Sequence, residues 1–301
     1  MNRQNCQARV HQRKNPGRVM APGQRGGVRG LLPAMLPRIT KRSPVVETPQ
    51  QAEARRAAAL DRAISTPRYA SYLNAAGHDA DLARKLYVWD RDLSTAILAD
   101  LAIVEVALRN ALHNALTSTY GPEWYQNIAL DDRSMKQVER AWGYLRNPRQ
   151  GHPSTPGRVI AQCTFGMWVN LLDAGGYAGR DPRRVHADYE QLWRSTLRSA
   201  FPGGRIEARN DPSPHASFTR TWVHSVAKTV NVLRNRVAHH EPLHNGFPLP
   251  GQRSGQQQSS RLTAAEGIEA YMKLTRMIDR NLAEWITNNT KVTALLAARP
   301  R

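Results

Sequence analysis

The sequence predicts an all-α protein. From residue 50 onward, apolar side chains recur at steps of three and four residues, the spacing that puts them on one face of a helix. No segment shows the strict alternation of apolar and polar residues that is typical of a strand, and the chain holds no internal repeat. With 301 residues, of which 41% are hydrophobic, the chain can bury the core of one large domain or two small ones.

Glycine, proline and capping residues divide this pattern into helices. Thr66 followed by Pro67 marks one helix start, and the longest amphipathic stretch runs from about Asp92 to Thr119, where Gly121-Pro122 ends it. We expect helices over residues 51–64, from 66, around 82–89, and over 92–119, 132–145, 159–172, 186–200, 220–239 and 263–286. We expect loops over residues 146–158, 202–217 and 246–260.

Residues 1–49 are expected to form a disordered basic tail. Residues 1–48 hold ten Lys/Arg and a single acid, Glu47, so this segment alone contributes 10 − 1 = +9 to the net charge of +19. Its Pro/Gly/Arg-rich composition favours disorder, and it lacks the continuous apolar stretch of a secretory signal. Met20 and Met35 offer alternative translation starts. We therefore expect a tail over 1–49, one helical domain over 50–290 and a short C-terminal tail over 291–301.

The charge balance favours a polyanionic partner. Lys and Arg bind phosphates by releasing counterions, and a large net charge attracts polyanions at long range. A genome whose proteins are generally rich in arginine would give the same composition, and this alternative stays open. Cys6 and Cys163 suggest neither a disulfide framework nor a metal cluster, and no apolar run is long enough to cross a bilayer. We expect a cytoplasmic protein.

The polar segment whose side chains are best suited to chemistry on a phosphate is Leu233-Arg234-Asn235-Arg236-Val237-Ala238-His239-His240. An arginine holds phosphate with a planar, permanently charged fork, and a histidine can exchange a proton near neutral pH. Arg234 and Asn235 precede the two histidines by about one helical turn. A second Arg-Asn pair, Arg109-Asn110, lies inside the long helix. Glu105 stands four residues before Arg109, on the same face, and can pair with it.

These residues carry a resemblance to a known family. Arg234 followed by His239, with four residues between them, or by His240, with five, is similar to the Arg-x(4–6)-His motif of HEPN domains (higher eukaryotes and prokaryotes nucleotide-binding). More narrowly, the chain resembles the Abi-like family of bacterial abortive-infection proteins over about residues 65–285. The matching blocks, in order, are Leu86-Tyr87-x-Trp89 with Leu93-Ser94, Glu105 through Asn110, Phe165-Gly166-x-Trp168-x-x-Leu171, and Leu233 through His240.

The resemblance implies a HEPN-like helical bundle with additional helices, which forms a homodimer and cleaves RNA without a metal or cofactor. It implies a role in phage defence or in a toxin–antitoxin pair, with tRNA, mRNA or rRNA as substrate and an antitoxin or phage-derived trigger as a further partner. Arg234 and either His239 or His240 would be catalytic. Asn235, Glu105, Arg109 and Asn110 would contact the substrate or support the groups that do.

Simpler interpretations compete with this one. Arg234 and Asn235 would then only bridge helices, and the histidines would be ordinary residues of a helix C-terminus. The Glu105–Arg109 pair would be a structural ion pair, and the tryptophans would pack the core. His240-Glu241-Pro242-Leu243-His244 also reads as the zinc-protease pattern His-Glu-x-x-His, but Pro242 disrupts the unbroken helix that this pattern needs. A non-catalytic RNA- or nucleotide-binding module, and an antitoxin-like scaffold, are the alternative functions.

Overall fold

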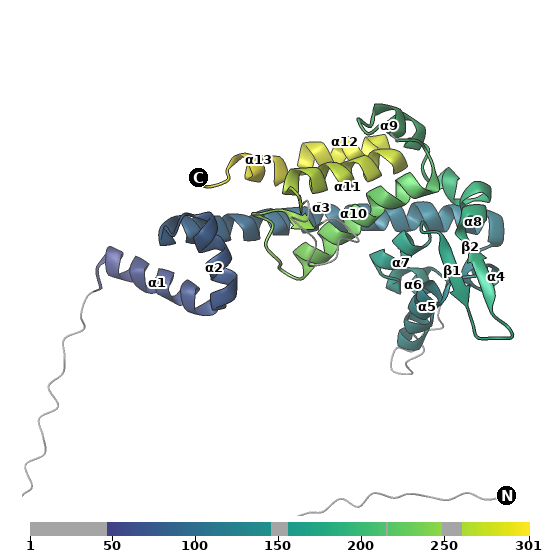
Figure 1. Cartoon of the computed structure of the whole chain (residues 1–301), viewed down its shortest axis with the longest axis horizontal. Coiled ribbons are helices and arrows are strands. Elements are labelled where there is room, and N and C mark those ends of the chain that lie inside the picture. Colours follow the sequence, from purple (N-terminus) through teal and green to yellow (C-terminus); the bar gives the residue numbers. More distant parts are fainter. Residues whose placement is uncertain (1–46, 146–155, 215, 249–260) are drawn as a thin grey trace, which may run out of the picture. The chain divides into compact units, whose positions relative to one another are not determined.

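The computed structural model describes residues 47–145, 156–214, 216–248 and 261–301. In this part of the chain the protein consists of thirteen α-helices, one 3-10 helix and two two-stranded antiparallel sheets (Figure 1). The prediction of an all-α fold is confirmed, and the two small sheets are the departure from it. The expected basic tail up to residue 46 lies outside the described residues. Residues 50–301 form one compact unit.

The central element is α3 (Ala80–Tyr120), a helix of 41 residues. Asp79 caps its start, since its carboxylate accepts the N–H groups of Asp81 at 2.9 Å and Leu82 at 3.0 Å. Gly121, with a φ of +82°, ends it. The structure joins the two segments that we expected around 82–89 and over 92–119, because no glycine or proline interrupts the apolar stripe between them. The stripe comprises Leu86, Leu93, Ile97, Leu101, Val104, Leu108, Leu112 and Leu116, all buried.

Several helices pack along α3. They include α2 (Thr66–Ala75), α10 (Arg220–Ala238), α11 (Ala264–Ile278) and α13 (Val292–Ala297). Asp100 on α3 accepts hydrogen bonds from Tyr271 Oη at 2.8 Å and from Thr290 Oγ1 at 2.6 Å, which ties α3 to α11 and to the start of α13. Trp89 Nε1 donates to the Leu295 carbonyl at 2.6 Å. Part of the expected C-terminal tail is therefore a helix docked on the core.

The remaining helices surround this core. They are α1 (Pro49–Ala63), α4 (Trp124–Asn127), α5 (Asp132–Leu145), α6 (Pro156–Gln162), α7 (Phe165–Asn170), α8 (Tyr189–Ser195), the 3-10 helix η2 (Leu197–Ala200), α9 (Gly204–Asn210) and α12 (Arg280–Asn289). The sheets are β1 (Gly175–Ala178) with β2 (Val185–Asp188), and β3 (Phe247–Pro248) with β4 (Arg261–Leu262).

Several expected boundaries were wrong. The segment 159–172 is two helices, interrupted at Cys163-Thr164, and the start of the segment 186–200 is strand β2. The segment 263–286 is interrupted at Asp279, whose carboxylate caps the start of α12 by accepting the N–H groups of Asn281 and Leu282.

The expected loop 202–217 contains α9. Gly203 and Gly204 suggested a loop, but they are required for close packing. A Cβ on Gly203 would meet the Arg276 carbonyl, and one on Gly204 would meet the Phe218 ring. Glycine at these two positions therefore allows two segments to approach each other closely, and does not mark a reversal of the chain.

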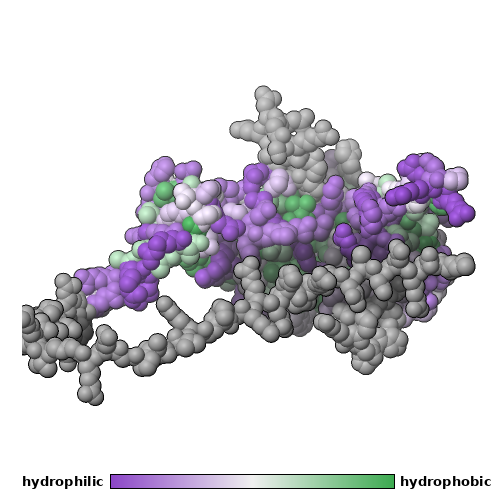
Figure 2. Space-filling model, turned by 90° about the horizontal axis from the view of Figure 1, so that it is seen from below, coloured by the Kyte–Doolittle hydropathy of each residue, from purple (hydrophilic) through white to green (hydrophobic). Residues whose placement is uncertain are grey.

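Trp124, Trp168 and Trp193 are buried, as core packing requires, whereas Trp285 is 53% exposed. The face of the protein shown in Figure 2 is mostly hydrophilic, with small hydrophobic patches. Among the helices that the structure describes, none combines the length and hydrophobicity needed to span a membrane.

Candidate functional site

The Arg-Asn…His-His segment forms the last turns of α10 and its C-terminal cap. Thr219 caps the start of this helix at the N–H of Trp222, and its buried side carries Val223, Val226, Val230, Leu233 and Val237. At the other end, the N–H of Glu241 donates to the Arg236 carbonyl at 2.9 Å and that of His240 to the Val237 carbonyl at 3.1 Å. These two bonds define a Schellman cap.

His240 occupies the left-handed position of this cap, with a φ of +56°. Glycine usually fills this position, because a Cβ there costs about 1–2 kcal/mol. Histidine adopts this conformation more readily than most residues, and His78 also does so in this chain, with a φ of +69°. His239, the residue before it, has an ordinary backbone conformation and an exposed side chain.

The chain beyond the cap is fixed to α3 by Asp90. Both carboxylate oxygens of Asp90 lie 3.1 Å from the Leu243 nitrogen, and Oδ2 accepts the Tyr72 hydroxyl at 2.6 Å. Asp90 is only 3% exposed, and this burial raises its pKa, against the opposing effect of these hydrogen bonds. Arg236 adds a second tie, since its Nε donates to the Pro242 carbonyl at 2.8 Å. The position of His240 is therefore fixed by the helix cap and by the two contacts that hold Pro242 and Leu243 after it.

His244 lies in a different environment from His240. It is buried, its ring stacks at 4.3 Å from the Tyr72 ring, and its Nε2 lies 3.2 Å from Ser71 Oγ. Burial lowers the pKa of His244. Because α10 ends at Ala238, the two histidines of the His-Glu-x-x-His pattern do not share a helical face. Within the described ranges, no group of three or more His, Cys, Asp or Glu side chains is arranged to hold a metal ion.

A pocket of about 270 Å³ opens between α2, α3 and the end of α10. Its polar lining includes His240 and two arginines, Arg68 from α2 and Arg91 from α3. Arg91 pairs with Asp92 at 2.7 Å, whereas Arg68 has no carboxylate partner in the part of the chain that the structure describes. The other lining residues are Tyr72, Tyr87, Asp90, Ser94, Thr95, Leu98 and Val237. Two guanidinium groups beside an imidazole suit an anionic ligand such as phosphate.

Arg234 is not among the residues that line this pocket. Its Nε lies 3.4 Å from Glu105 Oε2 on α3, and the two side chains are 33% and 26% exposed. Glu105 therefore pairs with Arg234, not with Arg109 as we had considered. Arg109 Nε instead donates to Asn110 Oδ1 at 3.4 Å. Asn235 is exposed on α10.

An exposed strip of α3 connects these two regions. Leu98, at the pocket, is 37% exposed and Val106, beside Glu105, is 42% exposed. Ala102 and Asn110 are also exposed and share this face, since the four residues follow one another at steps of four. The strip thus runs from the pocket to the Arg109-Asn110 pair.

Local sequence patterns did not point to Asp90, Tyr72, Arg68 or Arg91, and His244 entered only through the His-Glu-x-x-His pattern. One signal was available for Asp90. It occupies a position of the apolar stripe of α3, between Leu86 and Leu93, and a carboxylate at a core position must have partners in the folded protein. The partners themselves are 18 and 153 residues away along the chain, beyond the reach of local patterns.

Comparison with known proteins bears on the same part of the chain. No curated protein and no solved structure matches the chain. A family model described as Abi-like protein matches residues 64–245, which include α2, α3, α10 and the cap at His240. This match covers more than half of the 301 residues, and we conclude that the chain belongs to the Abi-like protein family.

Proposed function

We propose that this protein is a metal-independent endoribonuclease of bacterial phage defence, of the abortive-infection or toxin type. One observation carries the proposal: His240 is held in a left-handed cap at the edge of a pocket that also contains Arg68 and Arg91. A proton-transfer group beside phosphate-binding cations is what RNA cleavage without a metal requires. The family membership supports the defence role.

In the proposed reaction, the RNA 2′-hydroxyl attacks the adjacent phosphorus and the bond to the 5′-oxygen breaks. A histidine takes the proton of the 2′-hydroxyl, and an acid returns a proton to the leaving 5′-oxygen. The products are a 2′,3′-cyclic phosphate and a 5′-hydroxyl. We assign the proton transfer to His240, with His239 beside it as the second candidate. Arg68 and Arg91 would stabilise the charge that develops on the phosphorane oxygens.

Arg234 would act in a homodimer. The strip of α3 that carries Leu98 and Val106 is an exposed apolar surface flanked by both regions. Two copies associated through it would bring the Arg234–Glu105 pair, Arg109 and Asn110 to the same interface as the pocket. Asn235, exposed on α10, would orient the phosphate there. An antitoxin or a phage-derived trigger would control the activity.

A second candidate function is a non-catalytic RNA- or nucleotide-binding module of a defence complex. The observation that favours it is the position of Arg234: its Nε faces Glu105, and it lies outside the pocket that His240 lines. Among the residues that the structure describes, the arginine of the motif is therefore not part of the pocket that His240 lines. A pocket with two guanidiniums could hold a phosphate without cleaving RNA.

The test is cleavage of total bacterial RNA by the purified protein in excess EDTA, with His240→Asn and His239→Asn beside the wild type. Asparagine adopts the left-handed conformation more readily than most residues, so His240→Asn should keep the cap while removing the acid–base group. We expect the wild type to cleave and His240→Asn to lose cleavage, with 5′-hydroxyl ends on the fragments. Cleavage that both variants retain would refute the assignment, and RNA binding without cleavage by the wild type would favour the binding module.

A further inference from the structure

The β1–β2 hairpin presents an aromatic and basic face to solvent. In the antiparallel register Tyr177 lies opposite His186, so both side chains are on the same face. Their rings meet edge to face, with centroids 5.0 Å apart. The guanidinium carbon of Arg184 lies 3.9 Å from the Tyr177 ring centroid. Tyr177 nevertheless remains 51% exposed.

The turn of the hairpin is strongly cationic. Between the strands, residues 179–184 carry Arg180, Arg183 and Arg184 and only one acid, Asp181. All four are exposed, and none of the three arginines is within ion-pair distance of a carboxylate among the described residues. The turn projects beyond the neighbouring helices (Figure 1). Three guanidinium groups thus lie within six residues, and of these, in the part of the chain that the structure describes, only Arg184 contacts an aromatic ring, that of Tyr177.

The other face of the hairpin is packed against the protein. Ala187 is fully buried, and Gly176 lies against Asp131, where a Cβ would be 3.5 Å from the Asp131 side chain. Gly179 N–H donates to Asp132 Oδ1 at the start of α5, at 3.1 Å. The direction in which Tyr177 and Arg184 point is therefore fixed by this packing.

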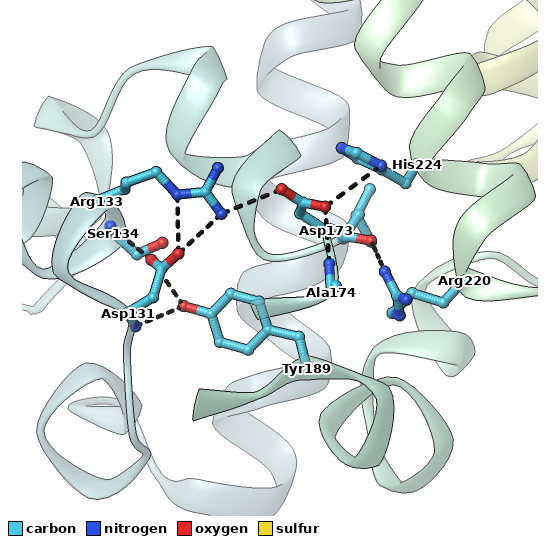
Figure 3. A network of polar contacts seen from close by, with 9 residues as sticks. Asp131, Arg133, Ser134, Asp173, Ala174, Tyr189, Arg220 and His224 are labelled. Carbon is cyan, nitrogen blue, oxygen red and sulfur yellow. Dashed lines mark hydrogen bonds and ion pairs between the residues drawn. The ribbon is translucent and has the colours of Figure 1, made fainter. Parts of the chain in front are cut away.

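Both ends of the hairpin are held by one polar network (Figure 3). Arg133 bridges Asp131 at 2.9 Å and Asp173, just before β1, at 3.1 Å. Tyr189, just after β2, donates its hydroxyl to Asp131 Oδ1 at 3.2 Å and accepts the Asp131 N–H at 3.0 Å. Burial raises the pKa of Tyr189 to about 12, so this hydroxyl stays protonated.

The same network reaches the first turns of α10, the helix that carries Arg234 and ends at Ala238, just before His239 and His240. Asp173 Oδ1 lies 3.9 Å from His224 Nδ1, and Arg220 donates to the Leu172 carbonyl at 2.9 Å (Figure 3). The residues on both sides of the hairpin are thus held by this network, which also contacts α10.

We propose that this hairpin is a binding element for single-stranded RNA, which engages the strand outside the pocket at His240. Arg180 and Arg183 contact the phosphates, and a base stacks on the Arg184 guanidinium, extending the Tyr177–Arg184 stack. A single-stranded nucleic acid is the ligand that the chemistry favours, because it offers phosphates and unpaired bases together, and the proposed function makes that nucleic acid RNA. This inference rests on the part of the proposed function that makes RNA the partner.

The test measures binding of the full-length protein to a fluorescein-labelled 2′-O-methyl oligouridylate of about twelve nucleotides, which cannot be cleaved by 2′-hydroxyl attack, over a range of salt concentrations. We expect the triple variant Arg180→Gln/Arg183→Gln/Arg184→Gln to bind about tenfold more weakly and to lower the slope of log K against log salt by about 1.4, since two arginines contact phosphates. Tyr177→Leu should also weaken binding about tenfold but leave the slope unchanged, because stacking releases no counterions.

A matched control separates the hairpin from general electrostatics. The triple variant Arg56→Gln/Arg62→Gln/Arg209→Gln removes the same charge from exposed positions on α1 and α9. It should bind much more tightly than the hairpin variant. A third variant, Arg180→Lys/Arg183→Lys/Arg184→Lys, keeps the charge and should recover most of the salt slope but not the full affinity. Thermal unfolding checks that each variant is folded.

Cleavage of unmodified RNA separates this inference from the proposed function. If the wild type binds but does not cleave, and the hairpin variants lose binding, the inference holds while the ribonuclease fails. If the wild type cleaves and the hairpin variants show the same KM and the same affinity, the ribonuclease holds and the inference is overturned. It is also overturned if the control variant weakens binding as much as the hairpin variant, or if the wild type does not bind the oligonucleotide.

Discussion

Asp90, on α3, receives the backbone N–H of Leu243 from the chain that follows α10, with 3.1 Å from the nitrogen to each carboxylate oxygen. The same carboxylate accepts the Tyr72 hydroxyl from α2. One buried group therefore joins the three elements that surround the candidate pocket. Since His240 lies three residues before Leu243, its position depends on a carboxylate that does not itself belong to the Arg-Asn…His-His segment.

Replacing Asp90 tests this dependence. Asp90→Ala leaves two buried donors without an acceptor, and we expect the free energy of unfolding to fall by roughly 3 kcal/mol. Asp90→Asn keeps an oxygen for Leu243 and should cost about 1 kcal/mol. Urea unfolding followed by circular dichroism measures both. Equal stability of Asp90→Ala and the wild type would show that the carboxylate does not hold the loop.

The Arg234–Glu105 pair predicts an effect on RNA affinity. Glu105→Gln removes the negative charge beside Arg234 without shortening the side chain. If Arg234 meets phosphate, RNA binding should tighten by about threefold at low salt, a gain of about 0.6 kcal/mol. The free energy of unfolding should change by less than about 1 kcal/mol, because the pair is partly exposed. Arg234→Gln, measured beside it, should weaken binding, and identical affinities for both variants would exclude Arg234 from the RNA interface.

Replacing His240 by glycine should change stability and activity in opposite directions. Glycine tolerates the left-handed conformation at this position, so His240→Gly should raise the free energy of unfolding by about 0.5–1 kcal/mol. The same change removes the proposed proton-transfer group and should abolish cleavage. His239→Gly is the control, since His239 has a φ of −93° and gains nothing from glycine. A His240→Gly variant less stable than the wild type would contradict the argument from the cap.

His244 predicts a pH dependence of stability. Burial lowers the pKa of His244 in the folded protein, so below its ordinary pKa of about 6.5 the unfolded chain binds more protons than the folded one. The free energy of unfolding should therefore be unaffected by this group above about pH 7 and fall as the pH drops below 6.5, with a slope of at most about 1.4 kcal/mol per pH unit. Thermal unfolding between about pH 7 and 5 measures this.

The comparison with His244→Gln isolates that contribution. His113 and His224 also have pKa values lowered by burial and act in the same direction in the wild type and in the variant. The wild type should lose stability toward pH 5 more steeply than His244→Gln. Parallel curves would show that His244 does not titrate differently on unfolding.

The sequence predicted the helical class and the boundaries of the most regular helices. The segment 132–145 matches α5 and 220–239 matches α10 with its cap, because apolar periodicity and end signals agree there. The predicted boundaries were wrong where a residue serves a contact that only the folded structure shows. Gly203-Gly204 read as a loop although it packs against Arg276 and Phe218, and Asp279 divides a continuous apolar pattern by capping a new helix.

For the candidate site, the sequence by itself determined which side chains are available: an Arg-Asn pair and two histidines at the end of one helix, in a basic chain of the Abi-like family. Only the tertiary structure decided which groups meet. It pairs Arg234 with Glu105, lines the pocket at His240 with Arg68 and Arg91, and holds the loop through Asp90. The physical reason is that side-chain spacing sets which residues share a helical face, whereas contacts between helices depend on how distant segments pack.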